Sequence, residues 1–181
     1  MTRAVFLDRD GVLNDRVLRN GQPTAPFSVD ELRISRGVPE ALGALRAAGF
    51  QLIVVTNQPD VVRGHAERGH VEAIHALMRV SLPLDDIRVC YHDDGDGCAC
   101  RKPKPGMLYA AAVERDIQLA RSFLVGDRWR DIGAGKAAGC TTILVNAFPG
   151  ETKVEADVEF PDLSAAVKWI TSGPAKPSGK P

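Results

Sequence analysis

Short continuous apolar runs recur along the chain, separated by longer segments in which apolar residues return at helical spacing. Unbroken runs of this kind are typical of strands that are buried on both faces of a sheet. We therefore predict strands at residues 4–7, 51–57, 86–92, 122–127 and 141–145, and a weaker strand at residues 158–160.

The segments between these runs are predicted to be mostly helical. In residues 37–49, Val38, Leu42 and Leu45 form an apolar stripe at helical spacing. Residues 15–35 are polar and irregular, and they predict a loop with at most one short extended piece. Strands alternating with helices predict an α/β fold, a central parallel sheet with right-handed crossovers and helices on both faces. Further helices are predicted at residues 65–80, 107–115, 131–138 and 163–170.

The length of 181 residues suits one domain with a full hydrophobic core. We assign residues 1–171 to this single domain and expect residues 172–181, which are Gly, Pro, Lys, Ser and Ala, to form a flexible tail. The hydrophobic fraction of 44% and the charged fraction of 25% are ordinary for a soluble globular protein.

The formal net charge of zero provides no general attraction to nucleic acid or to anionic membranes. No apolar run approaches the roughly 20 residues that a membrane-spanning helix needs. The first residues lead directly into a predicted strand and lack the layout of a signal peptide. We therefore expect a cytoplasmic monomer with a small-molecule partner and no nucleic-acid or membrane partner.

Two carboxylates, Asp8 and Asp10, follow the first predicted strand and precede Gly11. Side chains two positions apart on an extended chain point the same way, and strand ends are where α/β folds build their sites. Two like charges this close need a cation or a shared proton, and Mg²⁺ prefers carboxylate oxygens. Asp8 and Asp10 considered without the rest of the chain could equally well belong to a polar turn after a strand.

Polar groups also end later strands. Thr56 and Asn57 end the second long run, Asp127 ends the fourth, and Lys102 lies in a loop that can reach the same rim. In a parallel sheet these ends share one edge. The sequence therefore predicts carboxylates, a hydroxyl, an amide and a cation around one point.

Taken together, these positions resemble the four motifs of the haloacid dehalogenase (HAD) superfamily of phosphatases. The match spans residues 4 to about 146, in the family's order. The matching residues are Asp8 and Asp10 in Asp-x-Asp-Gly, Thr56, Lys102, and Asp127 and Asp131 in Gly-Asp-x-x-x-Asp.

The resemblance implies a Rossmann-like HAD fold and hydrolysis through an aspartyl-phosphate. Asp8 would be the nucleophile, and Asp10 would be the general acid and then the general base. Mg²⁺ would bind Asp8, Asp127 and the backbone carbonyl of Asp10, while Lys102 would balance charge on the phosphate.

Three further residues receive roles from the same resemblance. Thr56 and Asn57 are expected to bind phosphate. Asp131 is expected to orient the metal site or Lys102, although an ordinary acid in the first turn of a helix is an alternative. The spacings from Asp8 to Thr56 and from Thr56 to Lys102 are filled by core elements, so no inserted cap domain is expected. The site should be open, walled by residues 15–35 and by a cysteine-rich loop.

That loop contains the sequence Cys90-x-His92-x5-Cys98-x-Cys100. Three thiolates and one imidazole form a recognised structural zinc set with no open catalytic position. Any single one of these cysteines could instead be a small hydrophobic residue packed in the core. We assign Cys140, which lies outside this loop, to the core.

The zinc-type loop followed by Arg-Lys-Pro-x-Pro-Gly-Met resembles a narrower group, the D-glycero-D-manno-heptose 1,7-bisphosphate phosphatases and the related histidinol-phosphatases. Arg101 lies between Cys100 and Lys102, so a zinc ion in this loop would fix its position, and we expect it to contact substrate. Asp-Arg-Asp-Gly-x-x-Asn at residues 8–14 and Thr56-Asn57-Gln58 favour heptose 1,7-bisphosphate, which is the leading expectation for the substrate. The five-residue spacing between His92 and Cys98 is closer to the histidinol-phosphatases, and the group usually has Ser-Gly where this chain has Pro59-Asp60, so histidinol phosphate is the alternative substrate. A phosphatase acting on nucleic-acid ends and a non-enzymatic zinc-binding interaction module are further alternatives, disfavoured by the neutral charge and by the converging motifs.

Overall fold

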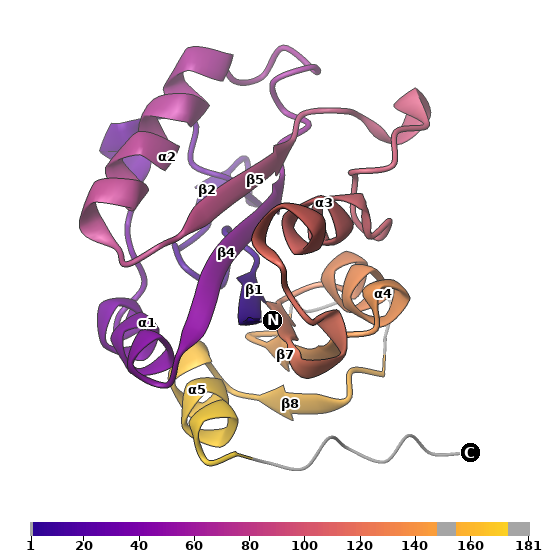
Figure 1. The fold of residues 1–181 in the computed structure, drawn as a ribbon. Coiled ribbons are helices and arrows are strands. Elements are labelled where there is room, and N and C mark those ends of the chain that lie inside the picture. Colours follow the sequence, from indigo (N-terminus) through magenta and orange to yellow (C-terminus); the bar gives the residue numbers. More distant parts are fainter. Residues whose placement is uncertain (1, 148–154, 174–181) are drawn as a thin grey trace.

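A computed structural model describes residues 2–147 and 155–173. Six parallel strands form one sheet in the order β5-β4-β1-β6-β7-β8, with β1 at its centre (Figure 1). The strands are β1 (Arg3–Leu7), β4 (Phe50–Asn57), β5 (Asp86–Cys90), β6 (Phe123–Gly126), β7 (Thr141–Val145) and β8 (Val158–Phe160). All six predicted strands are confirmed, although β5 ends at Cys90 and leaves His92 in the following loop.

Helices cover both faces of this sheet, as predicted (Figure 1). One face packs against α1 (Val38–Ala47), α2 (Arg68–Ser81) and α5 (Leu163–Thr171), and the other against α3 (Gly106–Arg115) and α4 (Trp129–Ala138). Among the described residues, no helix is long and apolar enough to cross a membrane.

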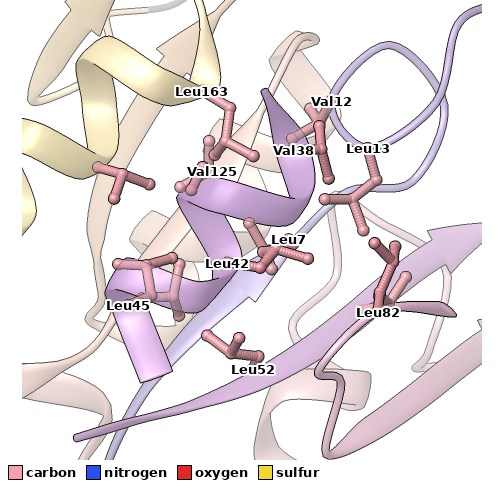
Figure 2. Close-up of a cluster of buried hydrophobic side chains, with 14 of the residues drawn as sticks. Leu7, Val12, Leu13, Val38, Leu42, Leu45, Leu52, Leu82, Val125 and Leu163 are labelled. Atoms are coloured by element: carbon pink, nitrogen blue, oxygen red, sulfur yellow. The ribbon is translucent and has the colours of Figure 1, made fainter. Parts of the chain in front are cut away.

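The two faces of the sheet bury separate hydrophobic clusters because successive side chains of a strand point to opposite sides. In β1, Val5 and Leu7 belong to the larger cluster with α1, and Ala4 and Phe6 belong to the smaller one with α3. Figure 2 shows Leu7 of the larger cluster meeting Leu42 of α1. Burial on both faces explains why the strands read as continuous apolar runs.

The segment between β1 and α1 differs from the prediction of a loop. It contains a two-stranded hairpin, β2 (Val17–Arg19) and β3 (Gln22–Thr24), and a short 3-10 helix, η1 (Val29–Glu31). The turn residues Asn20 and Gly21 have positive φ angles of 51° and 75°. Asn-Gly with this geometry favours a tight hairpin turn, which allows two short strands to pair within a segment of polar composition. No cap domain occurs in this described segment.

Two short 3-10 helices complete the described elements, η2 (Asp94–Asp96) in the cysteine loop and η3 (Leu119–Arg121) before β6. The assignment of residues 1–171 to one domain stays a prediction. Of the predicted tail, residues 172–181, all but the first two lie outside the described residues.

Candidate active site

The carboxyl ends of β1, β4 and β6 lie together because their register is fixed by the ladder. Leu7 at the end of β1 pairs with Val54 of β4 and with Val125 of β6. The next residue, Asp8, donates its backbone N–H to the carbonyl of Val125 at 2.9 Å. The predicted convergence of strand ends at one rim is therefore present, and Asp8 lies at its centre.

Lys102 reaches the same point from the loop before α3. Its Nζ donates to Asp8 Oδ1 at 2.7 Å, to Asp131 Oδ1 at 2.5 Å and to the carbonyl of Val55 at 2.7 Å. Burial alone lowers the pKa of this ammonium, but Asp131 and Asp8 outweigh it and raise the pKa above its ordinary value. Lys102 is thus a buried, permanently charged group that orients Asp8.

Asp131 has two hydrogen-bond partners. They agree both with the expected role of orienting Lys102 and with the alternative of an acid in the first turn of a helix. One carboxylate oxygen accepts from Lys102, and the other accepts the backbone N–H of Arg128 at 3.1 Å, which caps α4. Gly126 makes this approach possible, because a Cβ there would lie 2.1 Å from Cβ of Asp131. Asp131 is therefore both a helix-capping acid and a partner of the site lysine.

Three buried acids, Asp8, Asp127 and Asp131, bring one oxygen each within 4.8 Å of one another. Burial and the neighbouring Asp131 raise the pKa of Asp8 to about 6. Burial and the charge of Asp8 raise the pKa of Asp127 to about 7. Among the described residues Asp127 Oδ1 has no hydrogen-bond partner, while Oδ2 accepts from Arg16 at 2.7 Å. An orphaned buried oxygen beside two further carboxylates fits a divalent cation with oxygen preference.

Asp10 lies in the same cavity but in a different polar environment. Its carboxylate accepts from Arg9 Nε and Nη2 at 3.1 Å each, from Asn14 Nδ2 at 3.0 Å and from Gln58 Nε2 at 2.8 Å. Burial opposes ionisation, but the charge of Arg9 and these donors outweigh it and lower the pKa of Asp10. The resting carboxylate is therefore ionised, the form that accepts a proton.

Arg9 is fully buried between the site and α2. Its Nη1 lies 2.8 Å from Nε2 of His75, which is 2% exposed. A guanidinium can only donate, so Nε2 must be an acceptor and the imidazole must be neutral. Burial first, and then the charge of Arg9, lower the pKa of His75 to about 3. Neither residue was predicted as part of the site.

Two glycines of the predicted motifs, Gly11 and Gly106, lie where a side chain would clash with neighbouring atoms. Gly11 has φ of +95°, and a Cβ there would lie 2.3 Å from Asp127 Oδ2. Any side chain at this position would be strained and would displace the Asp127 carboxylate. Gly106, which begins α3, leaves no room for a Cβ either, because the carbonyl oxygen of Ala99 would be 2.3 Å away. Close backbone approach thus packs the lysine loop against the zinc-type loop.

The polar end of β4 positions the surroundings of Lys102. Asn57 donates from Nδ2 to the carbonyl of Lys102 and accepts its backbone N–H at Oδ1, each at 3.1 Å. Thr56 is buried, its hydroxyl accepts from Gln58 Nε2 at 2.8 Å, and it is not among the residues lining the cavity. Phosphate binding by Thr56 and Asn57 stays a prediction.

A cavity of about 290 Å³ opens above Asp8 and Lys102. The β2–β3 hairpin contributes Pro23 and Thr24 to its wall, and the loop after β4 contributes Asp60. Basic side chains outnumber acidic ones in the lining of this cavity, although the whole chain has a formal net charge of zero. The basic residues are Arg16, Arg63, Arg101, Lys102, Arg128 and Arg130.

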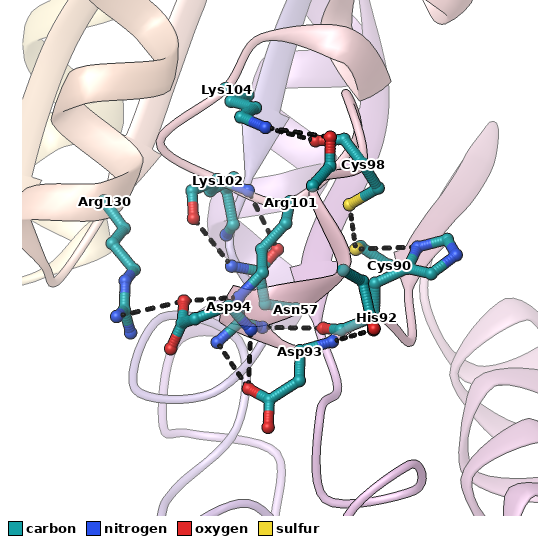
Figure 3. A network of polar contacts seen from close by, with 12 residues as sticks. Asn57, Cys90, His92, Asp93, Asp94, Cys98, Arg101, Lys102, Lys104 and Arg130 are labelled. Atoms are coloured by element: carbon teal, nitrogen blue, oxygen red, sulfur yellow. Dashed lines mark hydrogen bonds and ion pairs between the residues drawn. The ribbon is translucent and has the colours of Figure 1, made fainter.

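The four predicted zinc ligands converge at the end of β5 and in the loop after it. Figure 3 labels three of them, Cys90, His92 and Cys98. Cys100 Sγ lies 3.2 Å from Cys90 Sγ, 3.5 Å from Cys98 Sγ and 3.3 Å from His92 Nδ1. Tetrahedral Zn–S bonds of about 2.3 Å place sulfurs about 3.8 Å apart, so the cluster fits zinc. Burial and Cys100 raise the pKa of Cys90 to about 12, so its proton must leave when a metal binds. Cys140 packs in the smaller hydrophobic cluster, as predicted.

Comparison with known proteins gives a consistent result. The HAD-hydrolase-like family model matches residues 99–166. The D-glycero-β-D-manno-heptose-1,7-bisphosphate 7-phosphatase of Pasteurella multocida is 40% identical, over 80% of this chain and 82% of that protein. The corresponding protein of Pseudomonas putida is 34% identical, over 93% of this chain and 99% of that protein.

A solved structure extends the similarity to three dimensions. The D,D-heptose 1,7-bisphosphate phosphatase from B. bronchiseptica, complexed with magnesium and phosphate, superposes with a TM-score of 0.80. It is 32% identical, and the match covers 94% of this chain and 99% of that one.

Proposed function

The chain belongs to the HAD-like phosphatase family of the heptose-1,7-bisphosphate 7-phosphatases, and from this premise we propose its reaction. It is a Mg²⁺-dependent phosphatase that removes the 7-phosphoryl group of D-glycero-D-manno-heptose 1,7-bisphosphate. It acts as a cytoplasmic monomer on this small phosphorylated metabolite. The observation that carries the proposal is the buried Asp8–Lys102–Asp131 cluster beneath an arginine-lined cavity.

Asp8 is the nucleophile. Its carboxylate oxygen forms a bond to phosphorus while the bond from phosphorus to the sugar oxygen breaks, which leaves an aspartyl-phosphate. Asp10 gives a proton to the departing sugar oxygen. Water then attacks the phosphorus, Asp10 takes the proton of that water, and inorganic phosphate leaves as Asp8 is regenerated. The ionised resting form of Asp10 is suited to the second step and must take up a proton before the first.

Asp8, Asp127 and the backbone carbonyl of Asp10 would hold Mg²⁺, which supplies positive charge against the negative charge of the transferring phosphoryl group. The raised pKa values of Asp8 and Asp127, and the orphaned Asp127 oxygen, support this assignment. Lys102 adds a fixed charge that Asp131 and Asp8 keep in place.

A bisphosphate substrate accounts for the composition of the cavity wall. Lys102 lies at the floor beside Asp8, whereas three arginines line the cavity farther from the strand ends. Arg63 and Arg101 come from loops, and Arg130 comes from the first turn of α4. Guanidinium groups bind phosphate in bidentate geometry, so this wall suits a second phosphate that is not transferred. The Cys3His cluster holds one structural zinc, which stabilises the loop carrying Arg101.

Histidinol phosphate is a second candidate substrate, and one residue favours it. Asp60 places a carboxylate in the cavity, where it can bind a cationic amine. In the bisphosphate interpretation the same carboxylate accepts hydrogen bonds from sugar hydroxyl groups.

Phosphate release from heptose 1,7-bisphosphate, fructose 1,6-bisphosphate and histidinol phosphate, measured with added Mg²⁺, tests the proposal. We expect the highest kcat/KM for the heptose bisphosphate and no turnover by the Asp8→Asn protein purified in parallel. A higher kcat/KM for histidinol phosphate would select the second candidate. Absence of turnover with all three esters would contradict both.

A further inference from the structure

Two carboxylates of the zinc-type loop, Asp93 and Asp94, face the arginines of the cavity wall (Figure 3). Asp93 accepts from Arg63 Nε at 2.8 Å and from its Nη2 at 2.5 Å. Asp94 Oδ1 accepts from Arg101 Nε at 2.8 Å and lies 3.5 Å from Arg130 Nη2. The three arginines come from three different loops or helices, so these acids bring together groups that the chain does not otherwise join.

Arg101 is held most firmly of the three. Its side chain is 7% exposed, and its Nη1 donates to the backbone carbonyl of His92 at 3.0 Å. Together with the contact from Nε to Asp94, this fixes the plane of the guanidinium. Its Nη2 lies 3.8 Å from Oδ1 of Asp93, beyond hydrogen-bond distance. The N–H groups of Nη2 can therefore donate to a ligand. His92 and Asp94 therefore determine where Arg101 points.

The exposure of Asp94 argues against a role in stability. Its side chain is 59% exposed, and ion pairs of exposed carboxylates typically contribute well under the energy that holds a fold together. Three guanidinium charges on one wall repel one another and would turn toward water without nearby acids. Asp93 and Asp94 neutralise two of the three arginine charges, which leaves one net positive charge. The same ion pairs hold the guanidinium groups close to one another.

We propose that Asp94 is a positioning residue for recognition of the second phosphate of the substrate: it holds Arg101 and Arg130 where they bind that phosphate. The inference rests on the proposed function, since only a bisphosphate uses these donors. The opposite possibility is that Asp94 occupies the place of that phosphate and competes with it. The two possibilities predict KM changes of opposite sign.

The test compares Asp94→Ala and Asp94→Asn with a matched control, Asp96→Asn. Asp96 lies in the same loop, and its carboxylate accepts the backbone N–H of Asp93. The substrates are heptose 1,7-bisphosphate and p-nitrophenyl phosphate, which has no second phosphate. For the bisphosphate, Asp94→Ala should raise KM about tenfold with kcat within about twofold, as expected for one lost charge-assisted hydrogen bond.

Three further results are expected. Asp94→Asn should recover most of the bisphosphate KM, because its amide oxygen can still accept from Arg101 Nε. Both Asp94 variants should keep the wild-type KM for p-nitrophenyl phosphate and the wild-type zinc content. Asp96→Asn should match the wild type with both substrates.

A lower bisphosphate KM in both Asp94 variants would identify Asp94 as a competitor and overturn the proposal. Equal changes for both substrates, or a loss of zinc, would show a general effect on the loop and would also overturn it. A wild-type enzyme that hydrolyses neither ester would contradict the proposed function itself. A wild type active on both, with an unchanged KM ratio in Asp94→Ala, would contradict this inference alone.

Discussion

Replacing His75 tests whether the buried network behind Asp10 is charged as the structure indicates. His75 lies on α2 with 2% exposure and accepts from Arg9 at 2.8 Å. Burial and the charge of Arg9 lower its pKa from 6.5 to about 3, so the folded protein keeps a neutral imidazole where the unfolded chain binds a proton. His75→Gln removes the titrating group but keeps a side-chain oxygen that can accept from Arg9.

The sign and magnitude follow from proton linkage. Below its ordinary pKa of 6.5 the unfolded chain binds one more proton at this position than the folded protein does, so the free energy of unfolding falls as pH decreases toward about 3. Between about pH 7 and about pH 5 this single group costs the wild type about 2 kcal/mol. That value depends only on the unfolded pKa as long as the folded pKa lies well below 5.

Urea unfolding at both pH values provides the assay, with zinc and Mg²⁺ held constant. Other acids and bases titrate in both proteins. The informative quantity is therefore the change in the free energy of unfolding between the two pH values, compared between wild type and His75→Gln. The wild type should lose about 2 kcal/mol more than the variant on acidification. His70→Gln, on the exposed side of the same helix, should behave as the wild type. Equal losses in wild type and His75→Gln would refute the neutral, buried imidazole.

Three further outcomes are expected. Asp8→Asn should abolish turnover while the thermal transition is retained, because an amide cannot attack phosphorus; phosphate release and calorimetry check this, and near-normal activity would refute the assignment of the nucleophile. Asp127→Ala should raise the Mg²⁺ concentration needed for half-maximal activity or remove activity, and full activity of the wild type in EDTA would count against the metal site. Cys98→Ser should lower both zinc content and kcat/KM, whereas Cys140→Ser, in the core and outside the cluster, should keep its zinc; elemental analysis decides, and unchanged zinc in Cys98→Ser would exclude that ligand.

The sheet and the site floor were predictable because both depend on residues whose pattern is local. Val5 and Leu7 in one apolar run, and the acid that follows, determine a buried parallel strand with Asp8 at its end. Strand ends that share one edge account for the placement of Asp8 beside Asp127, whereas Lys102 comes from a loop, and its contact with Asp8 was expected from the motif resemblance. The β2–β3 hairpin departs from the predicted loop because its pairing depends on the Asn20-Gly21 turn, whereas the polar composition of the segment is typical of a loop.

The network behind Asp10 could not be predicted in this way, for a physical reason. Arg9 lies between two acids at a strand end, where an arginine would ordinarily extend into water, yet it is fully buried. Its position depends on His75, which is 66 residues away in sequence and carries no pattern beyond that of a helical residue. A buried, ionised Asp10 requires a compensating charge, and that charge requires a neutral acceptor behind it. Motif spacing identifies which groups perform the chemistry, whereas their protonation states depend on contacts formed only when α2 packs against the sheet.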